Sequence, residues 1–128
     1  DVATYPLLDG DSLKHELVMP HSAYNNKHWW TGIGICNPGS DPVTVFAVPY
    51  DLSGQPILAA GTFMELAGGT YEVFTVSDKF PGFAADIAHI KFSADDPVDA
   101  LIGGFYLYGN ASGRNVAARQ LISGGNLQ

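Results

Sequence analysis

The side chains that most often do chemistry are sparse in this chain. It has four histidines and one cysteine, which are His15, His21, His28, His89 and Cys36. A zinc site needs three or four converging ligands, and a pair of ligands on one strand face is spaced i,i+2. No two of these residues have that spacing or the helical i,i+4 spacing, so we expect no zinc site and no cofactor.

Acidic loops could serve calcium instead, because β-sandwiches bind this ion through clustered carboxylates and backbone carbonyls. Asp95, Asp96 and Asp99 are the calcium candidates, and Asp9 with Asp11 forms a smaller group. Neither group has the D-x-[DN]-x-[DN]-G arrangement of an EF-hand. The competing interpretation is that these residues cap turns and keep strand ends soluble, and no other metal ligands are expected.

Catalytic motifs are not apparent either. There is no G-x-S-x-G elbow, and Gly32-Ile33-Gly34 lacks the further glycine of a nucleotide-binding loop. Two carboxylates for glycoside hydrolysis would meet only in space. Glu65 and Glu72 fall on neighbouring predicted strands, where like charges facing each other destabilise a sheet. We therefore expect the two glutamates to lie on different faces of the sheet or to have a basic neighbour. We predict that the chain is not an enzyme.

Aromatic residues make up 12% of the chain and suggest a binding site. Tyr106 and Tyr108 are two residues apart and so share one face of a strand, and Trp30 is expected to extend that face. Exposed rings of this kind stack on sugars. Trp30, Tyr106 and Tyr108 are therefore the candidate ligand-binding residues for a polysaccharide. The competing interpretation places the same rings in a sandwich core.

Length and charge limit the classes of function. A chain of 128 residues fits one domain, and we expect a single domain over 1–128 with a core from about 12 to 122 and loose ends. The net charge is −7 and the six basic residues do not cluster. Nucleic-acid binding needs a basic stripe, so no nucleic-acid partner is expected. No apolar run approaches the ~18 residues of a membrane span, and we expect no membrane insertion.

Alternating apolar residues and frequent turn residues predict an all-β chain. The expected strands are 12–19, 28–37, 43–50, 56–66, 70–76, 87–93, 98–108 and 116–122. A short helical turn is expected over 77–80, capped by Ser77 or Asp78. The pattern predicts an antiparallel β-sandwich of about seven or eight strands.

The stretch HWWTGIGICNPGSDP, residues 28–42, is the most unusual in the chain. Alternation predicts a core face with Trp29, Thr31, Ile33 and Ile35 and a second face with Trp30, Gly32, Gly34 and Cys36. Glycines on a strand face indicate that something packs closely over it. We expect Trp30 to lie across its own glycines or to cover a sheet edge, with a bound ligand as the alternative.

Several motifs resemble those of β-sandwich modules in exported and cell-surface bacterial proteins. Trp29 to Pro38 is similar to their W-x-T-G-h-x-h-x-N-P motif, where h is hydrophobic, and Tyr50 to Gly54 is similar to their Y-D-x-x-G turn. Gly104 to Gly109 is similar to their late G-F-x-L-F/Y-G strand. The resemblance implies an immunoglobulin-like β-sandwich. No activity is known for these modules, so it implies no functional residues. Cys36 stands where these modules have Val or Ala, which fits a small buried hydrophobic residue.

These observations together predict a non-catalytic structural or adhesion-type interaction module. We expect it to be exported, to the periplasm, the cell surface or the medium. Its partner is expected to be a protein or a neighbouring domain, and homo-oligomerisation is a further hypothesis because weakly charged sheet edges pair with other chains. The alternative is a carbohydrate-binding module that uses exposed aromatic residues.

Overall fold

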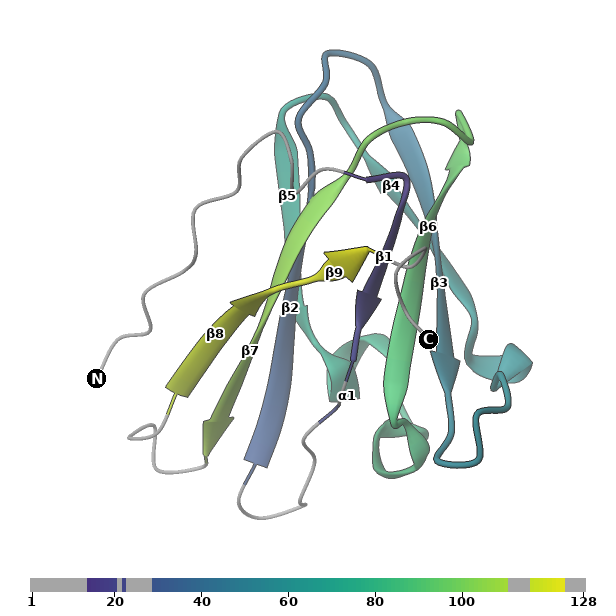
Figure 1. Ribbon diagram of the computed structural model, residues 1–128, viewed down its shortest axis with the longest axis vertical. Coiled ribbons are helices and arrows are strands. Elements are labelled where there is room, and N and C mark those ends of the chain that lie inside the picture. Colours follow the sequence, from purple (N-terminus) through teal and green to yellow (C-terminus); the bar gives the residue numbers. More distant parts are fainter. Residues whose placement is uncertain (1–13, 21, 23–28, 111–115, 124–128) are drawn as a thin grey trace.

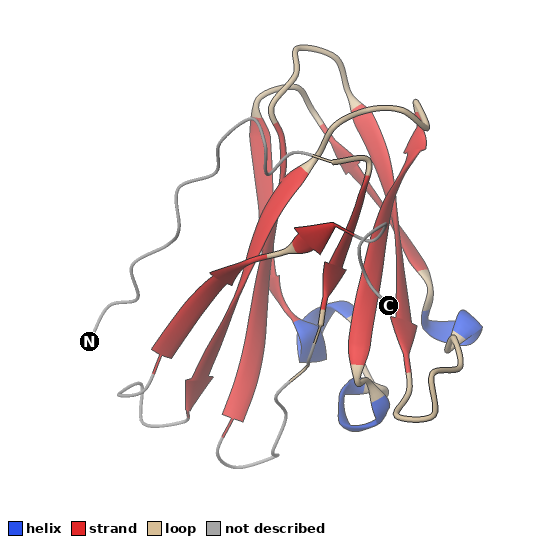
Figure 2. Ribbon diagram, in the orientation of Figure 1, coloured by secondary structure: helices blue, strands red, loops and turns tan. Residues whose placement is uncertain are grey.

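The computed structural model describes residues 14–20, 22, 29–110 and 116–123. Within these ranges the chain forms two antiparallel sheets that pack face to face (Figure 1), with helices confined to short connections (Figure 2). The strand orders are β4-β3-β6-β1-β9 in one sheet and β5-β2-β7-β8 in the other. The predicted all-β antiparallel sandwich is thus confirmed.

Nine strands are seen in the described ranges. The five-stranded sheet contains β1 (Glu16–Met19), β3 (Val43–Tyr50), β4 (Thr62–Leu66), β6 (His89–Asp96) and β9 (Ile122–Ser123). The four-stranded sheet contains β2 (Trp29–Asn37), β5 (Thr70–Thr75), β7 (Gly103–Asn110) and β8 (Val116–Gln120). The described helices are η2 (Leu58–Ala60), α1 (Val76–Lys79) and η3 (Ala84–Asp86), and none of them has the length and apolar character of a membrane span.

The core lies between the sheets and is built by alternation along the strands. In β3 every second residue, beginning with Val43, is buried. Ile33 and Ile35 of β2 face the core from the other sheet and are fully buried, as predicted. Burying one such aliphatic side chain contributes about 1.5–3 kcal/mol, so the core is the main source of stability.

The segment 56–66 differs from its prediction as one strand. Pro56 makes an isolated bridge to Tyr50, η2 follows, and β4 begins only at Thr62. Proline has no N–H for a ladder hydrogen bond, and the chain is instead held by the Ile57 N–H, which donates to the Pro49 carbonyl at 2.8 Å. The bounds of two later strands also differ from the predicted 87–93 and 98–108, since β6 runs on to Asp96 and β7 starts only at Gly103.

The helical turn is present but its predicted cap is wrong. The turn begins at Val76, and the Thr75 hydroxyl accepts a hydrogen bond from the Asp78 N–H at 3.3 Å. That places the cap three residues before the donor, in the usual N-cap relation. Ser77 and Asp78 lie inside the turn, so neither is its cap.

Asn37 connects the two sheets at one end of the sandwich. Its side chain is buried, and its amide donates to the carbonyls of Asp41 at 2.7 Å and Leu66 at 3.1 Å. Its side-chain oxygen accepts from the Gly39 N–H at 3.1 Å. The connection between β4 and β5 packs directly on this turn, because a Cβ at Gly68 would lie 2.3 Å from the Ser40 carbonyl oxygen.

Replacing Asn37 with alanine is expected to lower the free energy of unfolding by about 2–3 kcal/mol, because the buried Leu66 carbonyl and the partly buried Asp41 carbonyl lose their donor. Urea unfolding measures the loss. Thr70→Ala is the matched control, since the Thr70 hydroxyl donates to the Ala67 carbonyl at 2.7 Å in an exposed turn. It should cost less than about 1 kcal/mol, and equal losses in the two variants would contradict the role of Asn37.

Candidate functional site

Aromatic rings cover the glycines on the outer face of the four-stranded sheet. A Cβ added at Gly109 would lie 2.1 Å from the Trp30 ring, and one at Gly32 would lie 3.2 Å from it. A Cβ at Gly34 would lie 2.5 Å from the Phe105 ring. Trp30 therefore lies across glycines of its own strand and of β7, as expected, and rings over glycine replace the missing side-chain contacts.

The predicted row of three aromatic residues is not formed. Trp30 is opposite Gly109 in the β2–β7 ladder, whereas Tyr108 is opposite Thr31 and Tyr106 is opposite Ile33. Residues opposite each other in a ladder share a face, so the two tyrosines lie on the inner face and Trp30 on the outer face. The expectation that Trp30 extends the face of Tyr106 and Tyr108 is wrong, because alternation within a strand does not reveal how two strands are aligned. The side chain of Trp29 lies outside the described part of the chain.

Tyr106 and Tyr108 form a half-buried pair. Their ring centroids are 5.4 Å apart with the planes tilted by 59°, and Tyr106 packs against the core. Burial, with a smaller contribution from Tyr106, raises the pKa of Tyr108 to about 12. Both rings thus contribute to the sandwich interior rather than to a flat exposed platform.

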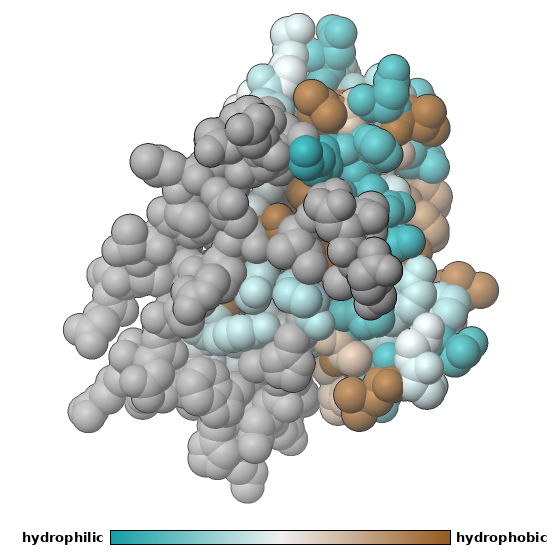
Figure 3. Space-filling model, viewed as in Figure 1, coloured by the Kyte–Doolittle hydropathy of each residue, from teal (hydrophilic) through white to brown (hydrophobic). Residues whose placement is uncertain are grey.

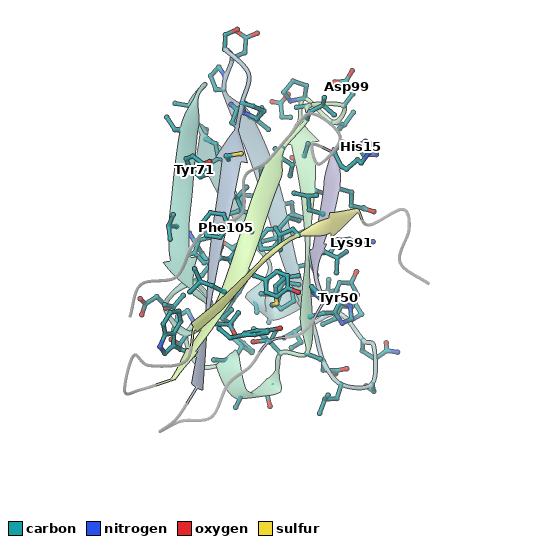
Figure 4. All side chains as sticks on the ribbon, turned by 60° about the vertical axis from the view of Figure 1, so that its left-hand side comes forward. His15, Tyr50, Tyr71, Lys91, Asp99 and Phe105 are labelled. Atoms are coloured by element: carbon teal, nitrogen blue, oxygen red, sulfur yellow. The ribbon has the colours of Figure 1, made fainter. Side chains whose placement is uncertain are left out.

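The outer face of the four-stranded sheet is apolar as far as its edge strand β5. Phe105 and Cys36 are buried on this face, and next to them Tyr71 and Val73 of β5 are 60% and 62% exposed. The Tyr71 and Phe105 rings lie 6.5 Å apart, and both project from this sheet in Figure 4. We call Tyr71, Val73, Cys36 and Phe105 the β5 strip.

Cys36 behaves as a small hydrophobic residue within the β5 strip. Burial raises the pKa of its thiol above the usual value, with a smaller opposing effect from a backbone hydrogen bond at Gly103. A thiol of this kind is a poor nucleophile at neutral pH. This agrees with the interpretation from the sequence.

Charge is distributed differently on the two outer faces. The outer face of the five-stranded sheet carries exposed Glu65 on β4 and a Lys91–Glu16 ion pair at 3.6 Å. No charged side chain is found among the described residues of the other outer face. Glu72 of β5 points inward and pairs with Lys79, whose ammonium also lies 4.8 Å from the Phe74 ring centroid. The expected basic neighbour of Glu72 is therefore present.

Two open depressions lie at opposite ends of the sandwich, each about 530 Å³ in volume. The first is mainly apolar and is lined by the turns before β3 and β7, including Pro38, Pro42 and Leu101. The second is lined by Phe83 together with Asp51, Ser53 and Asp86. Figure 3 shows hydrophobic surface near both ends as separate patches among hydrophilic residues.

The calcium candidates do not come together as ligands. In the part of the chain that the structure describes, no three His, Cys, Asp or Glu side chains are grouped so that they could hold a metal ion. Asp95 and Asp96 are exposed at the end of β6, where the ladder with β3 is irregular between Thr44 and Val45. His21, His28, Asp9 and Asp11 lie outside the described residues.

Val73 was not singled out by the sequence analysis, although the sequence holds a signal for it. Residues 70–75 have apolar side chains on both faces of the strand, with Tyr71 and Val73 on one and Phe74 on the other. A strand of this kind is either buried on both faces or exposes one apolar face. Its position at the sheet edge decides between the two, and that position is visible only in the structure.

The fold and this surface define a β-sandwich with an apolar edge strand. No family model and no curated protein matches the chain. The chain is similar to a solved structure described as "Crystal Structure of Thermotoga maritima 1070", with a TM-score of 0.68 and 10% sequence identity. The similarity covers 86% of this chain and 94% of that chain, and at this identity it establishes the fold alone.

Gly109→Ala is expected to lower the free energy of unfolding by about 1–3 kcal/mol, because the new methyl group meets the Trp30 ring. Gly39→Ala is the control, since its Cβ would come no closer than 3.5 Å to the Asn37 side chain. In a Trp30→Ala background the cost of Gly109→Ala should largely vanish, giving a positive coupling in a double-mutant cycle. Additive losses would show that the ring does not cover this glycine.

Stability should fall as the pH is lowered through the titration range of histidine. Burial, with a smaller contribution from Lys91, holds the pKa of His89 below its usual value, and its ring stacks on Tyr50 at 4.7 Å. The unfolded chain then binds the proton more readily, so stability is present above the unfolded pKa of about 6.5 and is lost below it. Urea unfolding at several pH values should show this dependence weakened in His89→Phe, which keeps the stacked ring. His15→Phe, at an exposed position, is the matched control for the loss of a histidine.

Proposed function

We propose that this chain is a non-catalytic interaction module of an exported or cell-surface protein and that it binds another protein through the β5 strip. The observation that carries the proposal is the exposure of Tyr71 and Val73 beside a sheet face without described charges. Single exposed apolar residues are common on proteins. Two that continue a buried apolar row along an edge strand are typical of a contact surface.

The chemistry of the strip favours a protein partner. An edge strand offers backbone hydrogen bonds to an added strand, and alternate side chains supply specificity. Tyrosine is enriched at such contacts because it combines a large apolar ring with a polar end. The export and surface location are supported by the resemblance of Trp29–Pro38 and the following turn to bacterial surface modules.

Carbohydrate binding remains the second candidate, at a different place from the one predicted. The depression lined by Phe83, Asp51 and Asp86 combines a ring with two carboxylates, and sugars are bound by stacking on rings and by hydrogen bonds to such groups. One oxygen of Asp51 is already used, since Oδ1 accepts from the N–H groups of Ser53 at 2.9 Å and Gln55 at 3.0 Å. This reduces what the depression offers a sugar.

A charged residue within the strip should abolish partner binding. Val73→Lys is compared with Val98→Lys, which alters a valine that is 70% exposed in the turn between β6 and β7. Immobilised wild-type protein and Val98→Lys should retain the same proteins from an extract of the cells that make it, and Val73→Lys should lose them. Equal urea midpoints for the three proteins verify that folding is unaffected.

Equal retention by all three proteins would reject the strip as the binding surface. Retardation of all three in gels that contain polysaccharide, with no protein retained by any, would replace the proposal with the carbohydrate-binding alternative.

A further inference from the structure

We propose that the partner at the β5 strip is a second copy of this chain, joined by antiparallel pairing of the two β5 strands. The four-stranded sheet would then continue across a two-fold axis. This inference rests on the proposed function, because it names the partner of the same surface.

β5 has few of the devices that usually prevent edge pairing. In the described ranges it forms one edge of its sheet, and its six residues Thr70–Thr75 pair with β2 in a regular register without a bulge. Edge strands are normally protected by Lys or other charged residues, Pro, bulges or very short length. β5 contains no Lys and no Pro, and its one charged residue, Glu72, is paired with Lys79 on the inner face. β4 is the edge strand of the other sheet on the same side of the sandwich. By contrast with β5, it carries the exposed charged residue Glu65 on its outer face.

The distribution of charge favours a second copy over a basic partner. Two copies with a net charge of −7 each repel one another over most of their surface. Among the described surfaces the strip adds little to this repulsion, because Glu72 is paired with Lys79 on the inner face and the outer face has no described charge. A basic partner would instead be attracted to the acidic loops, and the strip would offer it no complementary charge.

The sequence of β5 selects one register. For the two outer faces to lie on the same side of the joined sheet, outward residues must oppose outward residues. A two-fold axis at Glu72 would place two carboxylates directly opposite each other, which is unfavourable. An axis at Val73 instead places Val73 opposite Val73 of the second copy and Tyr71 opposite Thr75, so the two valines meet and no two carboxylates do.

Sedimentation equilibrium of the purified chain tests the association. Wild type should form a reversible dimer whose dissociation constant decreases as salt is added, because salt screens the repulsion between like-charged copies. Val73→Lys should weaken the dimer at least about tenfold, since it sets two lysines opposite each other. Val73→Thr keeps a β-branched residue and should retain it, and Val98→Lys should behave as wild type.

Cross-linking tests the register. Two cysteines form a disulfide when their Cα atoms are roughly 4.4–6.8 Å apart, a distance that directly opposed residues satisfy. Val73→Cys in a Cys36→Ala background should therefore give a covalent dimer under mild oxidation. Val98→Cys in the same background should remain monomeric under these conditions.

A wild-type chain that is monomeric at all concentrations would overturn the inference, as would a dimer that Val73→Lys leaves intact or one that fails to cross-link at position 73. None of these results would reject the proposed function, which fails only if retention of protein from the extract, a second copy of this chain included, does not depend on Val73. A dimer that cross-links at position 73 would support both.

Discussion

The packing of aromatic rings on glycine is the constraint on which the four-stranded sheet depends. Trp30 and Phe105 cover Gly109, Gly32 and Gly34, so β2 and β7 approach their covering rings more closely than any larger residue would allow. A ring in this position shields the backbone beneath it from water. The sheet thus carries its own cover of side chains on the outer face, at the cost of requiring glycine at fixed positions in two strands.

This cover ends before the edge of the sheet, and the end of the cover defines the proposed interaction surface. Phe105 reaches as far as Tyr71, but the described rings do not extend over Val73. The inner side of β5 is occupied by the Glu72–Lys79 pair and Phe74, which fix the strand on the sandwich. One strand therefore combines a firmly attached inner side with an apolar outer side that is in contact with water.

Sequence reasoning predicted the elements well where one face of a strand is buried. The strand 43–50 was predicted with its observed bounds, because alternation is clean there and turn residues flank it. The prediction of a single strand over 56–66 was wrong, because a proline and a 3-10 turn interrupt an apolar run that has no periodicity of its own. The candidate site was predicted only in part. Trp30 was placed correctly over its glycines, yet its relation to Tyr108 depends on the register between β2 and β7, which no local pattern encodes.

The hydrogen bonds of Asn37 have a consequence for local opening of the fold. One amide side chain holds the end of β2, the turn that follows it and the last carbonyl of β4, while the Asn37 carbonyl accepts from the Gly69 N–H just before β5. The two edge strands on this side, although they belong to different sheets, are thereby attached to a common point. We therefore expect β4 and β5 to fray together, with their amide protons exchanging with solvent as one unit.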